Sequence, residues 1–186
     1  MSIIFVIAIF MSIIGLAVGL TPYILMSLGL YSLAKNRGID APWLAWIPVG
    51  NAYIMGCLSK DSPFIKKKLP KMHIIYPAVT GAYMLLAIVM SAVFMAVYMP
   101  LFKTNFTGFT GIDFGNGYII VYYIIIYLAA ILVSVLGVFV MYHIYKVYDR
   151  ANAVLYTVLS AIGLSFIFLF VIRNKPPVIE DAPQIE

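Results

Sequence analysis

Residues 41 to 56 read APWLAWIPVGNAYIMG, and the way in which this stretch meets a lipid bilayer decides the fold. The stretch is apolar enough to enter lipid, but it contains two prolines, two glycines and an asparagine. Residues 41–57 would make about 26 Å of straight helix, short of the roughly 30 Å hydrocarbon core. Pro48 and Gly50 also disfavour a straight helix. We therefore expect a bent element rather than a crossing.

The same residues predict how the element is built. Asp40 is placed to cap a first short helix that carries Pro42 in its first turn, where the missing amide proton costs little. Pro48 ends that helix, because the residue before a proline is pushed out of the helical region. A turn then follows, and Asn51 is placed to cap a second short helix through Met55.

Two placements of this element remain open. Trp43 and Trp46 are three residues apart and share a helix face, as aromatic rings at the headgroup level do. An interfacial element needs only wet headgroups around it. A re-entrant element needs the other helices to cover its irregular backbone, since an unpaired polar group in hydrocarbon costs several kcal/mol.

Outward from this stretch, the composition is that of a membrane protein. Of the 186 residues, 64% are hydrophobic and 10% are charged, whereas soluble domains carry about 25% charged residues. We predict an all-α polytopic integral membrane protein with four transmembrane helices plus the broken interfacial or re-entrant element 41–57. The spans are expected at about 2–34, 73–101, 118–143 and 153–172.

These spans make up a single transmembrane domain over residues 1–175, and residues 176–186 are expected to form a disordered tail. The first span would be about 50 Å long as one helix, well above the hydrocarbon thickness. Pro22 is expected to kink it, and Thr21 to cap a restarted helix. The stretch 145–152 is expected to be a short link between the last two spans.

The basic residues predict the orientation. The connector 35–72 carries seven Lys and Arg residues and the link 145–152 carries two, whereas Lys103, Arg173 and Lys175 fall on the other side of a four-span arrangement. The positive-inside rule then places connector 35–72 in the cytoplasm and both termini outside.

The net charge of +5 favours binding to anionic lipid headgroups rather than to nucleic acid, because the basic residues lie beside apolar spans. Four lysines of the connector, Lys66, Lys67, Lys68 and Lys71, are candidates for holding it to the membrane surface. A topology signal without a specific ligand explains the same run.

The spans contain few groups that could do chemistry. They carry no Asp, Glu, Lys or Arg, and their only histidines are His73 and His143, which could meet at similar depth. Intramembrane relays and metal centres depend on such groups. Cys57 is single and has no metal-ligand spacing. We therefore expect no metal, no cofactor and no enzymatic activity. The serines within the spans have no base in the sequence pattern that would activate them; they are Ser12, Ser27, Ser91, Ser134, Ser160 and Ser165.

Gly15 and Gly19 form a GxxxG pattern, which lets two helix backbones approach closely. Contact with another helix of the same chain and self-association of the chain both explain the pattern.

Three segments carry a resemblance: RGIDAPWLAWIPVGN at 37–51, NAVLYTVLS at 152–160 and FLFVIRN at 168–174. In these segments the chain resembles a family of small, functionally uncharacterised multi-spanning membrane proteins of bacteria. The resemblance implies a location in the bacterial inner membrane, and it supplies no catalytic residue.

From these observations we expect a non-enzymatic membrane scaffold or accessory subunit. Its partners would be the lipid bilayer, a partner membrane protein or a second copy of the chain, and its contact residues would include Trp43, Trp46, Pro48 and Asn51. The alternative is a small oligomeric permease or lipid-handling protein in which element 41–57 lines a pathway.

Overall fold

The computed structural model describes residues 3–60, 62, 65, 71–105 and 117–178. This part of the chain is helical and contains no strand. Four of its helical segments are long and apolar enough to cross a membrane, namely Ile9–Asn36, Met72–Ala96, Ile120–Tyr148 and Ala153–Ile172. The prediction of an all-α polytopic membrane protein is therefore confirmed.

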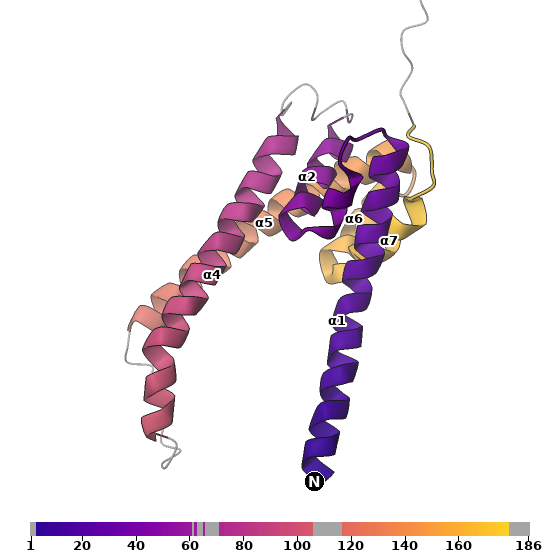
Figure 1. Cartoon of the computed structure of the whole chain (residues 1–186). Coiled ribbons are helices and arrows are strands. Elements are labelled where there is room, and N and C mark those ends of the chain that lie inside the picture. Colours follow the sequence, from indigo (N-terminus) through magenta and orange to yellow (C-terminus); the bar gives the residue numbers. More distant parts are fainter. Residues whose placement is uncertain (1–2, 61, 63–64, 66–70, 106–116, 179–186) are drawn as a thin grey trace, which may run out of the picture. The chain divides into compact units, whose positions relative to one another are not determined.

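Figure 1 shows the order of the elements along the chain. They are α1 (Ile3–Asn36), the 3₁₀-helix η1 (Pro42–Trp46), α2 (Pro48–Ser59), α4 (Met72–Asn105), α5 (Gly117–Tyr148), α6 (Ala153–Leu159), the π-helical turn η2 (Ser160–Leu164) and α7 (Ser165–Ile172). The chain forms two compact units. Unit 1 comprises residues 1–77 and 138–186, and unit 2 comprises residues 78–137.

Helix α1 continues through Pro22. The Thr21 hydroxyl donates a hydrogen bond back to the carbonyl of Ala17, at 2.8 Å. This is the bond that threonine makes one turn back inside a helix, so Thr21 does not cap a restarted helix as the sequence suggested. In an apolar setting the bond satisfies the hydroxyl without interrupting the helix.

Helix α7 packs against the C-terminal part of α1, as Figure 1 shows. The contact is close at Gly29, where an added Cβ would lie 2.8 Å from the carbonyl carbon of Leu169. Leu30 and Leu33 are completely buried in the same region. A residue without a side chain is thus what lets the backbones of α1 and α7 approach each other.

The broken element bends at Ile47, earlier in the chain than the turn expected at residues 49–51. Ile47 has an extended backbone, with φ −105° and ψ 130°, and it separates η1 from α2. The prediction that Pro48 ends the first helix is confirmed, but residues 49–51 continue α2 instead of forming a turn. The helix starts early because proline is well suited to the first helical position.

The predicted caps are also wrong, because a proline rather than a polar cap begins each of the two helices. Neither η1 nor α2 has a side-chain cap, so Asp40 does not cap the first helix. Asn51 lies inside α2, and its backbone amide donates to the carbonyl of Ile47 at 2.7 Å. Helix α2 also runs to Ser59, beyond the expected end at Met55.

In unit 2, the described parts of α4 and α5 are brought together by aromatic residues. The rings of Phe94 and Tyr122 stack with centroids 5.6 Å apart. Many of the large apolar side chains on these helices are exposed in the isolated chain, among them Leu85, Ile88, Leu128 and Ile131. Exposed apolar side chains of this kind are what a lipid-facing surface requires. Helix α5 continues to Tyr148, so the expected link at 145–152 is shorter than predicted.

Gly15 and Gly19 are not used for packing within the described part of unit 1. A Cβ added at either position would have no atom within 4 Å beyond the local helix. Contact with another helix of the chain and self-association through this pair both stay predictions.

Gly29, which is closely packed, can be compared directly with Gly19, which has open space around it. Gly29→Ala should lower the free energy of unfolding by up to about 2 kcal/mol, because overpacking costs about 1–3 kcal/mol and replacing a helical glycine by alanine returns only roughly 1 kcal/mol. Gly19→Ala is the matched control and should leave stability unchanged or raise it. Thermal unfolding of both variants in detergent measures the difference, and equal transitions would contradict the close packing at Gly29.

Candidate functional site

The bend of the broken element is tied to the middle of α1. The hydroxyl of Tyr23 donates a hydrogen bond to the backbone carbonyl of Trp46. Tyr23 precedes Asn36, the last residue of α1, by thirteen residues, which is about 20 Å of helix. The chain therefore leaves the end of α1, runs back along it through η1, and turns at Ile47. The bond satisfies a carbonyl at the point where the helical pattern is broken.

The two sides of this element have opposite surroundings. Trp43 is 58% exposed and Trp46 is 41% exposed, so η1 presents its tryptophans outward. Helix α2 lies inside unit 1, with nine of its twelve residues buried. Gly50 has no room for a side chain, because a Cβ there would overlap the carbonyl of Leu44. This protein cover is the condition that a re-entrant element has to meet.

The other expected contact residues of the element differ in exposure. Pro48 is exposed beside the tryptophans. Asn51 is only 7% exposed and lies within unit 1, so it is not available to lipid. Of the connector lysines, Lys71 is exposed just before α4, whereas Lys66, Lys67 and Lys68 lie outside the described residues.

Exposed basic residues lie where the helices of unit 1 begin or end. One lies in the last turn of α1, and the others follow α2, precede α4 and follow α5. We call them the basic rim: Lys35, Lys60, Lys71 and Arg150. The helices η1, α2, α6 and α7 contain no charged residue. The rim therefore marks the boundary between the apolar body of unit 1 and its polar end.

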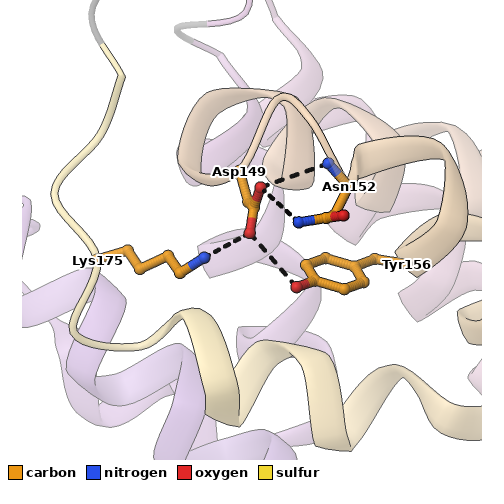
Figure 2. A network of polar contacts seen from close by, with 4 residues as sticks. All are labelled: Asp149, Asn152, Tyr156 and Lys175. Carbon is orange, nitrogen blue, oxygen red and sulfur yellow. Dashed lines mark hydrogen bonds and ion pairs between the residues drawn. The ribbon is translucent and has the colours of Figure 1, made fainter.

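A half-buried carboxylate lies at the same end, in the link between α5 and α6 (Figure 2). The Asp149 carboxylate accepts hydrogen bonds from the ammonium of Lys175, from the hydroxyl of Tyr156 at 3.3 Å and from the side-chain amide of Asn152 at 3.2 Å. The backbone amide of Asn152 lies 3.4 Å from the same carboxylate. The side chain of Asp149 is 10% exposed, and that of Lys175 is 42% exposed. Asp149 is thus surrounded by donors and serves as a clamp.

These contacts shift the pKa values of both members of the ion pair. The hydrogen bond from Lys175 is the main cause that lowers the pKa of Asp149 below its ordinary value of 3.8, with Asn152 adding to it against the effect of burial. The same bond raises the pKa of Lys175 above 10.5. The pair is therefore ionised across the physiological range, and Asp149 is not poised to exchange a proton near neutral pH.

The segment after α7 is held by further bonds at this end. The amide of Val178 donates to the carbonyl of Val147 at 2.7 Å. The side-chain amide of Asn36 donates to the carbonyl of Arg173 at 3.1 Å. The C-terminal segment is therefore tied both to the end of α5 and to the end of α1.

Sequence reasoning missed one serine–histidine pair. The hydroxyl of Ser62 lies 2.5 Å from Nδ1 of His143, and both residues are buried. The expectation that no serine meets a histidine considered only the serines in the spans, and it did not consider a connector serine folded against α5. Burial leaves this hydroxyl without a surface that a substrate could reach, so the pair is a packing contact between the connector and α5.

His73, which the sequence placed where it could meet His143, makes no such contact through its Nδ1. Its Nδ1 is buried and makes no hydrogen bond in the described structure. The described residues also contain no group of three or more histidine, cysteine or acidic side chains that could hold a metal ion.

Comparisons with known proteins add no relative. No family model, no curated protein and no solved structure matches the chain.

The clamp has a testable pH dependence. Asp149→Asn should lower the stability of the protein at neutral pH by about 1 kcal/mol or less, which is the usual range for a partly exposed ion pair. Because the pKa of Asp149 is lowered on folding, its contribution is present above pH 3.8 and is lost as the pH falls through the lowered pKa. The difference in thermal stability between the wild type and the variant should therefore vanish in strong acid.

Asp40→Asn is the control, because Asp40 is exposed and forms no ion pair with another described residue. It should unfold like the wild type at both pH values. A pH-independent difference for Asp149→Asn would contradict the role of the carboxylate charge.

Proposed function

We propose that the protein is a non-enzymatic scaffold or accessory subunit of the bacterial inner membrane, and that it engages anionic lipid headgroups through its basic end. The observation that carries this proposal is that exposed basic residues and exposed tryptophans belong to the same unit. The basic rim supplies charge at the polar end, and Trp43 and Trp46 supply an apolar contact below it. Lysines at an anionic leaflet and aromatic rings in the bilayer are complementary membrane contacts.

In this proposal connector 35–72 faces the cytoplasm and the N-terminus faces outward. The concentration of Lys and Arg in the connector supports this orientation through the positive-inside rule. The bacterial inner membrane follows from the resemblance carried by segments 37–51, 152–160 and 168–174.

We also propose that element 41–57 is re-entrant rather than interfacial. Two observations support this: Trp46 is bonded to Tyr23, far along α1 from the basic rim, and α2 is covered by protein. The turn at Ile47 then lies within the hydrocarbon, where lipid surrounds the tryptophans. An element lying flat among the headgroups would not meet Tyr23 about 20 Å from the end of α1.

A scaffold fits this arrangement better than a permease does. A pathway lined by the broken element would need polar groups that water can reach, and Asn51 is the amide of α2 best suited to that role. Its 7% exposure and its position inside unit 1 leave it closed off in this conformation. The buried face of α2 therefore works as packing, and its outward neighbours work as contacts.

The lipid contact can be tested by charge removal. Replacing Lys66, Lys67 and Lys68 together by Gln should weaken retention of anionic lipid on the order of a hundredfold, because each lysine near an anionic surface contributes about 1 kcal/mol. Native mass spectrometry of the full chain with phosphatidylglycerol or cardiolipin, against phosphatidylethanolamine, measures the retention. Lys103→Gln is the control and should retain lipid normally. Equal retention by all three chains would overturn the lipid role.

Tryptophan fluorescence tests the depth of the element. The chain has only two tryptophans, and both lie in η1, so the intrinsic emission reports on this element alone. In vesicles, lipids brominated near the middle of the acyl chain should quench the emission more strongly than a quencher attached to the headgroup. The opposite order of quenching would show an interfacial element and would contradict the re-entrant placement.

A further inference from the structure

The fourth apolar segment, Ala153–Ile172, has the length and composition of a membrane span but is not one straight helix. It consists of α6, the turn η2 and α7. Gly163 within the turn has φ +96°, a left-handed conformation that glycine adopts without strain. Helix α6 measures about 10 Å and α7 about 12 Å, so neither arm alone reaches across a core of roughly 30 Å.

Aromatic rings join the two arms across the turn. Tyr156 on α6 stacks on Phe168 on α7, with ring centroids 4.6 Å apart and planes at 20°. Tyr145 of α5 packs edge-on against both rings. Its hydroxyl lies 2.8 Å from the hydroxyl of Ser160, which fixes the turn to α5. The arms are therefore folded against each other and not laid end to end.

The two ends of the segment lie together. Asp149, just before α6, is paired with Lys175, just after α7. Val147 and Val178 are joined by a backbone hydrogen bond at 2.7 Å. A segment that crossed the membrane would separate these residues by the full hydrocarbon thickness.

The outer surface of the hairpin is apolar. Ile162 in the turn is 71% exposed, and the other exposed apolar side chains of the hairpin belong to both arms: Val154, Leu155, Val158, Ile167 and Val171. Such a surface is unsuited to water and matches lipid. The hairpin is thus immersed while both of its ends remain at the polar end of unit 1.

We infer that residues 153–172 form a re-entrant hairpin that enters and leaves the membrane by one face, closed by the Asp149–Lys175 pair, so that the C-terminal segment lies on the same face as connector 35–72. This replaces the expectation from four crossings that connector and C-terminus lie on opposite faces. It also brings Arg173 and Lys175 to the basic side, which then holds eleven of the twelve Lys and Arg residues, with Lys103 alone on the other.

Cysteine labelling tests the shared face directly. Lys60→Cys, Thr107→Cys and Pro176→Cys are made singly in the full chain and treated with a membrane-impermeant maleimide in sealed vesicles of each orientation. The unmodified chain, whose single Cys57 is buried, gives the background. The Pro176→Cys chain should label in the same vesicles as the Lys60→Cys chain and in the opposite ones from the Thr107→Cys chain. Labelling of Pro176→Cys together with Thr107→Cys would overturn the hairpin.

A second measurement uses the wild-type chain in its membrane. A carbodiimide joins a carboxylate to an amine that touches it, and mass spectrometry should find the Asp149–Lys175 cross-link. Loss of the cross-link in Lys175→Arg serves as the control. Absence of the cross-link in the wild type would also overturn the closure. Neither result depends on which face is cytoplasmic or on lipid binding, so this inference and the proposed function can fail separately.

Discussion

A chain that stops being helical inside a membrane must find partners for its freed peptide groups within the protein, because hydrocarbon offers none. The structure provides such partners at two breaks in its helices. At the first break, Tyr23 of α1 satisfies the carbonyl of Trp46. At the second, the backbone leaves the helical conformation at Gly163 of η2, and the Tyr145 hydroxyl contacts the hydroxyl of Ser160 beside it. Long helices thus provide the polar contacts that the short ones cannot make for themselves.

The same helices also provide the packing surface. Gly29 admits the backbone of α7, and Gly56 of α2 lies against the start of α4, where an added Cβ would come within 2.7 Å of His73 Cα. Small residues are the usual means of close helix contact where no hydrophobic effect drives association. Their positions explain why the buried core of unit 1 gathers at one end of α1, while the N-terminal half of α1 stays exposed in the isolated chain.

Much of this architecture could be predicted from the sequence. The uncharged apolar tracts predicted the ends of the long helices to within a few residues, and Pro48 predicted the position of the first break. The caps predicted at Asp40 and Asn51 do not form, since a helix-starting proline competes with a polar cap and here decided the boundary. The Ser62–His143 contact and the Asp149–Lys175 pair join residues far apart in sequence, and local patterns do not report on such pairs. Gly163 gave no signal either, because an isolated glycine is common in apolar helices and only its φ angle reveals the turn.

The contact between Gly29 and α7 also bears on the order of biosynthesis. The ribosome makes α1 before α7, so the surface of α1 at Gly29 lacks this partner until residues 165–172 have been synthesised. Two arms of about three turns or fewer are too short to be inserted stably on their own. A chain interrupted before Ser165 therefore lacks the helix that packs against Gly29 of α1.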